Sequence, residues 1–107
     1  LMELFKAEEL FDSLIRKLVE EDYAEYVQFT GRYRWLRRGQ DLAVLGEVLQ
    51  VRGYFKDWYD YQERHNALTK FFSVVGGKGY GERTFQKSTI EEVFNQKKGQ
   101  FSFLRPA

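Results

Sequence analysis

Helical spacing of apolar residues is the feature of this sequence that most limits what it can fold into. After Asp57, large apolar and aromatic side chains recur at steps of three and four residues, which places them on one face of an α-helix. The residues on this face are Trp58, Tyr61, His65, Leu68, Phe72 and Val75. Asp57 stands where an N-cap belongs, so we expect a helix that runs from residue 58 to residue 75.

Three further helices are expected from the same periodicity and from capping residues. Residues 3–20 carry apolar side chains at helical spacing and predict an amphipathic helix. Asp41 has the position of an N-cap for a second helix, and Gly53 stands where a C-terminal glycine cap belongs. Gly46 lies inside this helix, where glycine costs about 1 kcal/mol relative to alanine, and it therefore indicates close contact with another helix. A capping box in residues 88–91 begins the last helix.

The connections between these helices are harder to assign. Residues 22–25 have capping-box spacing and predict a short helical turn through residues 26–29, which Thr30-Gly31 then interrupts. The segment RYRWLRRG, residues 32–39, fits either a short strand or an irregular arm. Near the end of the chain, residues 101–104 read FSFL and alternate as a short strand would.

We therefore expect a mostly α fold: a small orthogonal bundle of about four helices with a short C-terminal strand, and with a helix-turn-helix-like arrangement as one option. The chain of 107 residues, 43% hydrophobic and 18% aromatic, is sufficient for one packed core, so residues 1–107 are expected to form a single helical domain. Because the sequence opens with Leu1-Met2, we expect it to be a piece of a longer protein.

Composition excludes several classes of protein. The chain has no cysteine, which excludes disulfides and thiolate zinc sites and suits a reducing compartment. No apolar run approaches the ~18 residues of a membrane span, and no signal peptide is visible, so we expect a cytoplasmic protein without a membrane partner. The acidic residues are scattered, and His65 is the only histidine and lies on an apolar face. We expect no enzyme and no cofactor.

Charge is distributed unevenly along the chain. Residues 1–25 contain eight acidic and three basic residues, a net charge of −5, whereas residues 26–107 contain eight acidic and fourteen basic residues, a net charge of +6. The segment RYRWLRR concentrates four arginines around two aromatic side chains. The residues concerned are Arg32, Tyr33, Arg34, Trp35, Arg37 and Arg38. Arginine forks suit phosphate oxygens and aromatic rings stack on bases, which indicates nucleic-acid contact. Alternatively, the aromatic residues anchor the segment and the arginines pair with the acidic first helix or with an acidic protein.

A glycine cluster follows the third expected helix. The run GGKGYGER, residues 76–83, lacks the spacing of a phosphate-binding P-loop and that of a dinucleotide-binding fingerprint. Ending a helix and turning the chain is one interpretation of this run. In the other, Lys78 and Arg83 touch phosphate without specificity and add to the basic surface of the arginine-rich segment.

Part of the chain resembles a known family. The run LAVLGEVLQVRGYF, followed by LTKFFSVVG and then by RTF, is similar to the C-terminal domain of RteC-like regulators, which are found on mobile elements of Bacteroidetes. The matching residues are Leu42, Leu45, Leu49, Gly53, Phe71, Phe72, Arg83, Thr84 and Phe85. The resemblance covers about residues 27–90, and it implies a bacterial DNA-binding regulator with a helix-turn-helix-like domain.

Two functions follow as expectations. The first is a non-enzymatic, nucleic-acid-associated regulator whose basic aromatic segment contacts phosphate. The site residues expected for it are Arg32, Arg34, Trp35, Arg37, Arg38, Lys78 and Arg83. The second is a protein-interaction module that binds a partner, or a second copy of itself, through the acidic N-terminal helix.

Overall fold

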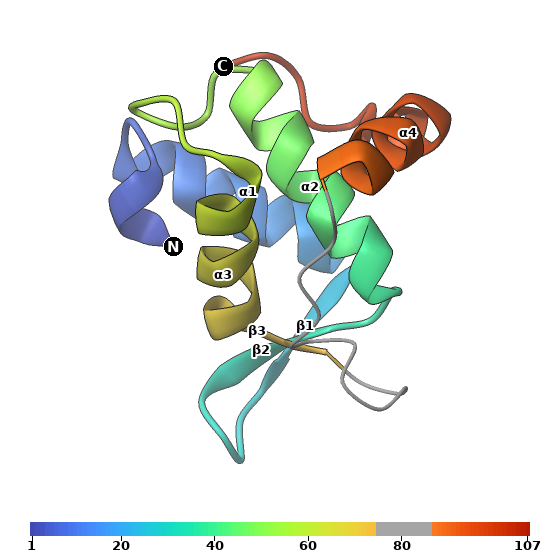
Figure 1. Cartoon of the computed structure of the whole chain (residues 1–107). Helices are drawn as coiled ribbons and strands as arrows, with labels where there is room; N and C mark the ends of the chain where they lie inside the picture. The colour runs from blue at the N-terminus through green and yellow to red at the C-terminus, as the bar shows by residue number, and fades with distance from the viewer. Residues whose placement is uncertain (75–86) are drawn as a thin grey trace.

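The computed structural model describes residues 1–74 and 87–107, with the backbone alone for residues 87–90. Its elements in chain order are η1 (Met2–Leu4), α1 (Glu8–Glu20), β1 (Ala24–Val27), β2 (Arg32–Trp35), α2 (Gly39–Val51), α3 (Tyr61–Phe71), β3 (Phe72–Val74), α4 (Lys87–Lys97) and η2 (Lys98–Phe101). Figure 1 shows the helices grouped over one side of a small sheet, from which the β1–β2 hairpin projects. The four helices expected from the sequence are present among the described residues, and a small three-stranded sheet accompanies them, so the fold is mixed α/β rather than purely helical.

The three strands lie in the order β1-β2-β3, so that β2 is central. The β1 strand pairs antiparallel with β2 across a short loop, and β3 pairs parallel with β2 after the crossover through α2 and α3. One face of the sheet packs under the helices, and its residues are Ala24, Tyr26, Tyr33, Trp35, Phe72 and Val74. The opposite face carries Glu25, Val27, Arg32, Arg34 and Ser73 and is mostly exposed.

The expected helical turn in residues 26–29 is wrong, because α1 has ended before it and the chain continues as strand β1. Asp22, at φ 61°, takes the left-handed position that follows a helix end. The N–H groups of Asp22 and Tyr23 donate to the carbonyls of Val19 (3.2 Å) and Leu18 (2.8 Å), the pattern of a Schellman motif. Aromatic and β-branched residues then favour the extended conformation.

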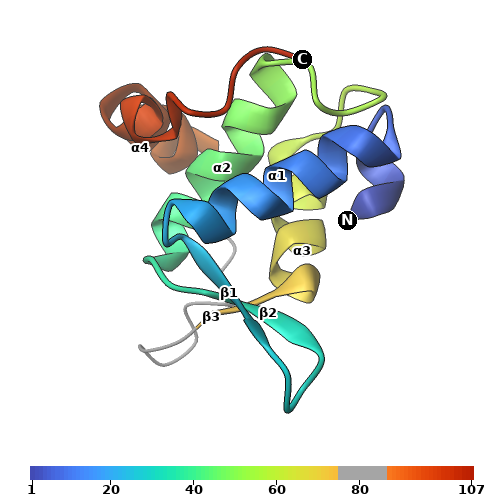
Figure 2. The ribbon, with the colours of Figure 1, turned by 180° about the vertical axis from the view of Figure 1, so that it is seen from behind.

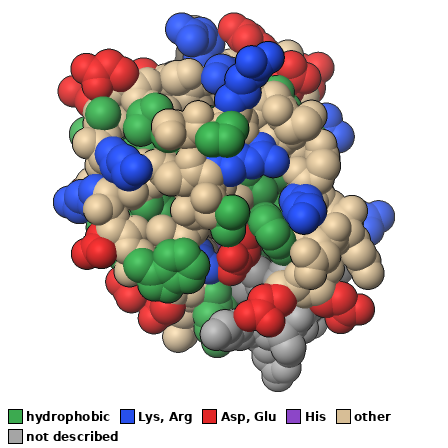
Figure 3. Space-filling model, turned by 90° about the horizontal axis from the view of Figure 1, so that it is seen from above, with side chains coloured by type: hydrophobic (Ala, Val, Ile, Leu, Met, Phe, Trp, Pro, Cys, Tyr) green, Lys and Arg blue, Asp and Glu red, His purple; other side chains and the backbone are tan. Residues whose placement is uncertain are grey.

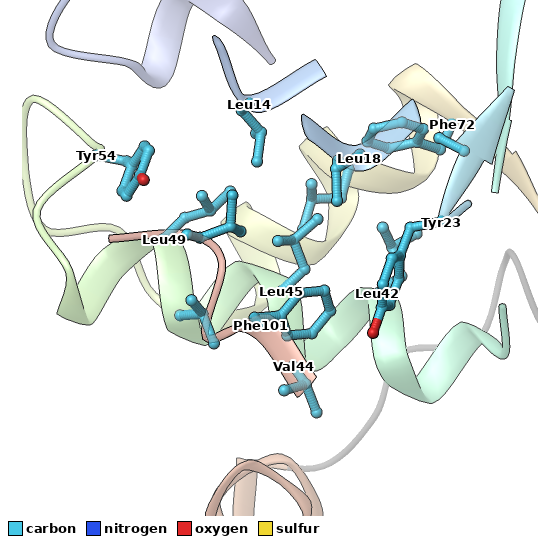
Figure 4. Packing of buried hydrophobic residues seen from close by; sticks show 14 of the residues in the cluster. Leu14, Leu18, Tyr23, Leu42, Val44, Leu45, Leu49, Tyr54, Phe72 and Phe101 are labelled. Atoms are coloured by element: carbon cyan, nitrogen blue, oxygen red, sulfur yellow. The ribbon is translucent and has the colours of Figure 1, made fainter. Parts of the chain in front are cut away.

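Helix α2 is the centre of the core. Ten of its residues are buried, so the apolar stripe expected from the sequence extends over most of the helix surface. Figure 4 shows Leu14 and Leu18 of α1 pointing toward Leu45 and Leu49 of α2, while Phe101 approaches from the C-terminal segment. Gly53, at φ 80°, follows the helix as predicted.

The expected cap at Asp41 is wrong, because α2 begins two residues earlier at Gly39, with Arg38 as its N-cap. The side chain of Asp41 is buried and accepts hydrogen bonds from Lys97 Nζ at 3.2 Å and Gln100 Nε2 at 3.1 Å. Asp41 therefore ties the first turn of α2 to α4 and to η2.

Helix α3 is shorter than its apolar periodicity predicts. Asp60, rather than Asp57, is the N-cap, and its Oδ1 accepts the N–H of Glu63 at 2.8 Å. At the other end Phe72 leaves the helix because it joins the sheet opposite Tyr33 and is fully buried there. Residue 75, at the expected end of the helix, lies outside the described residues.

Close contact between helices at Gly46 is confirmed. A Cβ atom at this position would lie 3.1 Å from Leu68 Cδ1 and 3.6 Å from Arg64 Cβ, so the small residue lets α3 approach α2. Arg64 is itself buried, and it donates to the Glu47 carboxylate and to the carbonyl of Tyr59.

The expected C-terminal strand in residues 101–104 is also wrong. These residues form the end of η2 and a turn. Phe101 and Leu104 are fully buried, and the Arg52 guanidinium donates to both of their carbonyls. The alternating apolar residues thus anchor a tail across the end of α2 instead of pairing in a sheet. The capping role expected of Ser88 concerns a side chain outside the described part of the chain.

Candidate interaction surface

The first half of the arginine-rich segment forms strand β2, which is the strand interpretation of the two that the sequence left open. Arg32 and Arg34 point to the open face of the sheet, while Tyr33 and Trp35 point to the helices. The alternation follows from the two-residue repeat of a strand. The guanidinium groups of β2 therefore lie on the solvent side, and its rings lie on the core side.

Trp35 is an expected site residue that the fold places in the core. Its side chain is fully buried, and it packs against Tyr23 and Phe72 at ring-centre distances of 5.9 and 5.5 Å. Its indole Nε1 donates to the Arg38 carbonyl at 2.9 Å, which satisfies its polar group. A base cannot reach this ring in the folded domain, so Trp35 has a structural role.

The four arginines of the segment have different surroundings. Arg34 Nη1 lies 3.0 Å from Glu25 Oε1, in an ion pair between neighbouring strands. Arg32 is exposed and donates to the carbonyl of Lys70. Arg37 is exposed, and its guanidinium lies 4.3 Å above the ring of Tyr23. Arg38 is exposed at the N-cap of α2.

Of the expected site residues, Lys78 and Arg83 lie outside the described residues. Whether they join the arginines of β2 in one basic surface stays a prediction. The remaining four arginines divide between the open face of the sheet, where Arg32 and Arg34 lie, and the segment that leads into α2, where Arg37 and Arg38 lie.

A groove that the sequence did not reveal lies between α1 and the hairpin. Its volume is about 410 Å³. It is lined by Phe11, Asp12, Ile15, Arg16, Val19 and Glu20 of α1, by Tyr33 of β2 and by Phe71 at the end of α3. Figure 2 shows the two elements that bound it, with α1 crossing in front of the other helices and the hairpin descending below it. The groove has an apolar floor and a charged rim.

Aromatic rings continue from the floor of this groove toward the edge of the sheet. Phe11 meets Phe71 edge-on at 5.3 Å, Phe71 stacks on Tyr33 at 5.7 Å, and Tyr33 meets Tyr26 edge-on at 5.2 Å. We call these four residues the aromatic row. Tyr26 is 51% exposed, so the row reaches solvent on the edge strand β1.

Beyond the aromatic row, the hairpin loop carries a fully exposed ring. Phe29 is 99% exposed at the tip of the hairpin, residues 28–31. The loop closes when the N–H groups of Thr30 and Gly31 donate to the Val27 carbonyl at 3.2 and 2.8 Å, with Gly31 at φ 69°. This closure holds Phe29 in the tight turn at the tip of the hairpin.

Sequence reasoning missed Phe29 and Val19 as surface residues. The signal that could have found Phe29 was the Thr30-Gly31 turn between two segments rich in aromatic and β-branched residues, which is the composition of a hairpin. Val19 is 39% exposed although it belongs to the apolar pattern of the first helix. No sequence signal distinguishes this position from the buried positions of the same helix.

His65 is buried, in agreement with the core or rim position expected for it, and its carbonyl accepts a hydrogen bond from Thr69 Oγ1. In residues 1–74 and 87–107, no group of three or more His, Asp or Glu side chains lies close enough together to hold a metal ion.

Figure 3 shows the end of the molecule away from the sheet, where acidic and basic side chains are mixed with small apolar patches and neither sign of charge dominates. No helix in the described part of the chain has the length and apolar character needed to span a bilayer.

Comparison with known proteins gave no match: no protein-family model fits the chain, and neither a curated protein nor a solved structure is significantly similar to it. The resemblance to RteC-like regulators therefore stays a prediction. The fold and the surface define this chain only as a small α/β domain with an aromatic-floored groove beside a projecting hairpin.

Proposed function

We propose that this domain is a non-enzymatic protein-binding module whose groove accepts an aromatic or large apolar side chain of its partner. The observation that carries the proposal is the groove of about 410 Å³ between α1 and the hairpin, with the aromatic row in its floor. A concave surface lined by rings and rimmed by a few charged groups is the usual form of such a site.

The acidic charge of α1 supports this function and indicates which side chains the partner should carry. The rim of the groove carries Asp12 and Glu20 with one base, Arg16, which lies 3.9 Å from Glu20. Both members of this ion pair are about two-thirds exposed, so the pair contributes little to stability and can open. The complementary partner segment has an aromatic anchor for the apolar floor and a basic residue for the acidic rim.

Peptide selection tests this function directly. A displayed library of random peptides is selected on the wild-type chain and counter-selected on Val19→Glu, which places a carboxylate in the groove wall. We expect the enriched peptides to share an aromatic residue and a neighbouring base, and to shift amide NMR signals of α1 and β2. Enrichment of peptides that bind Val19→Glu equally well would locate binding elsewhere and refute the groove as the site.

Contact with nucleic acid is the second candidate function, and the exposure of Arg32, Arg37 and Arg38 favours it. None of these three arginines takes part in an ion pair among the described residues, so their charge is not neutralised within this part of the chain. Arginines of this kind supply backbone contact without sequence readout.

A salt titration separates this candidate from protein binding. If the three arginines contact phosphate, the logarithm of the DNA-binding constant falls linearly with the logarithm of the salt concentration. Changing all three arginines to alanine should reduce the magnitude of this slope by about 3. Arg16→Ala is the matched control on the far side of the groove rim, and it should leave the slope unchanged. Absence of binding at low salt would remove the nucleic-acid candidate.

A further inference from the structure

We infer that the groove is filled by Phe29 from the hairpin tip of a second copy of this chain, in a reciprocal dimer. The inference rests on the proposed protein-binding function and names its partner. Phe29 is 99% exposed, which leaves a large ring in water on the same chain that carries an aromatic-floored groove. An exposed ring and an apolar groove on the same chain form a self-complementary pair.

Phe29 is exposed in its own chain because the hairpin holds it away from its own groove. The groove wall includes Val19 and Glu20 at the C-terminal end of α1, close to where the chain enters β1 at the root of the hairpin, and Phe29 occupies the tip. Each strand of the hairpin has four residues, which separates root from tip by roughly 13 Å. Two hairpins aligned antiparallel around a two-fold axis place each tip beside the root of the other, so both grooves are filled at once.

Strand β1 allows this antiparallel alignment. It is an edge strand, hydrogen-bonded to β2 on one side only within the described chain. An edge strand presents unpaired N–H and C=O groups, and a second copy of the same strand can pair with them. Tyr26 of this strand is half exposed and continues the aromatic row toward the partner, which extends the apolar contact beyond the tip.

Charge complementarity also favours a second copy. Helix α1 contains four acidic and two basic residues, a net charge of −2, and forms the wall of the groove. The hairpin, residues 24–35, contains one acidic and two basic residues, a net charge of +1, and Arg37 and Arg38 follow it in the chain. In the dimer, this weakly basic segment of each copy lies against the acidic helix of the other, which favours that orientation of the two chains.

The test uses sedimentation velocity on the whole chain from about 1 µM to about 1 mM. We expect the wild type to form a dimer and Phe29→Ala to raise the dissociation constant about 100-fold or more, because two buried rings are lost in each dimer. Val19→Glu should have a similar effect from the groove side. Trp58→Ala removes another highly exposed ring, 71% exposed in the segment between α2 and α3, and serves as the matched control with no effect.

Mixing the two variants gives the decisive measurement. Phe29→Ala keeps an intact groove, and Val19→Glu keeps an intact tip, so a mixture forms a heterodimer with one of the two contacts, whereas each variant alone has neither contact. We expect its dissociation constant to be about tenfold above that of the wild type, since about half of the two-ring contribution is retained. The dissociation constant of this heterodimer is measured by fluorescence anisotropy of a labelled Phe29→Ala chain that is titrated with the Val19→Glu chain.

Several outcomes would overturn the dimer. A wild-type chain that stays monomeric at about 1 mM refutes it, as does a dimer that Phe29→Ala leaves intact. A mixture of variants that fails to associate refutes the insertion of tip into groove. If the wild type is monomeric but the peptide selection still yields groove-binding peptides, self-association is wrong and the protein-binding function stands. If both experiments fail, the proposed function fails with it.

Discussion

Removing the carboxylate of Glu47 should destabilise the domain strongly, because Glu47 neutralises a guanidinium in the core. The Arg64 side chain is 4% exposed and donates to Glu47, whose own side chain is 16% exposed. Burial lowers the pKa of Arg64 below its usual value, and the nearby Glu47 carboxylate only partly offsets this effect. The guanidinium therefore lies in an environment that disfavours its charge, and Glu47 is its acidic partner there.

The expected magnitude follows from this geometry. Breaking a buried ion pair by removing one partner costs ~3–5 kcal/mol, and the partial exposure of Glu47 places Glu47→Gln near ~3 kcal/mol. For a domain of this size that is a large share of a total stability of ~5–15 kcal/mol. In urea unfolding followed by circular dichroism, the midpoint should fall by about 1–2 M.

A double variant checks the reasoning. Glu47→Leu with Arg64→Met removes both charges and replaces them with apolar groups, so it should be more stable than Glu47→Leu alone by at least ~1 kcal/mol. Gln62→Leu, an exposed substitution on the same helix α3, is the control and should change stability by less than ~0.5 kcal/mol. If the double variant is no more stable than Glu47→Leu, the uncompensated charge is not the cause of the loss.

Three further predictions concern stability and are read by chemical or thermal unfolding. Gly46→Ala should lower stability by about 1 kcal/mol, because crowding against a buried leucine outweighs the gain in helix propensity; a rise in the melting temperature would contradict this. Arg52→Met should cost about 2 kcal/mol, since two carbonyls in residues 101–104 lose their donor, and an unchanged midpoint would show that the tail is held otherwise. Burial raises the pKa of Tyr23 and of Tyr54 above 10.0. The contribution of these two hydroxyl groups to the free energy of unfolding is therefore complete below pH ~10 and is lost as the pH rises through their higher pKa values in the folded state. Unfolding midpoints that stay constant to pH ~11 in the wild type would refute the last of these.

The helices could be predicted from the sequence because their signals are local. The 3.6-residue periodicity, the Gly53 cap and the small residue at Gly46 each act within one helix or at one helix contact. The sequence predicts a longer α3 than the structure contains, because tertiary contacts determine where this helix begins and ends. Gln50 Nε2 donates to the carbonyl of Asp57 at 3.0 Å and Gln50 Oε1 accepts the N–H of Tyr59 at 2.9 Å, and these two hydrogen bonds hold the segment before α3 in a loop.

The sheet escaped prediction because long-range pairing holds it together. Strand β3 contains three residues and pairs with β2 some forty positions earlier in the chain, opposite Tyr33, Arg34 and Trp35. No local pattern in Phe72–Val74 distinguishes it from the last turn of an amphipathic helix. The same reasoning applies to the groove, since its walls come from α1, β2 and the end of α3 and meet only in the folded chain.

The ion pairs in the structure show whether the acidic part of the chain, residues 1–25, is neutralised by the basic part, residues 26–107. If the basic part of the chain neutralised the acidic part, ion pairs would join the two. Among the described residues only the Arg34–Glu25 pair does so, and it lies within the hairpin, not on α1. No ion pair in the described part of the chain joins an acidic side chain of α1 to an exposed arginine of residues 26–107. Charge pairing within one chain therefore does not account for the asymmetry. Of these arginines, Arg32 belongs to the hairpin, whereas Arg37 and Arg38 follow it, so the positive charge that faces the acidic helix of a second copy in the inferred dimer comes from the hairpin and from the segment that leads into α2.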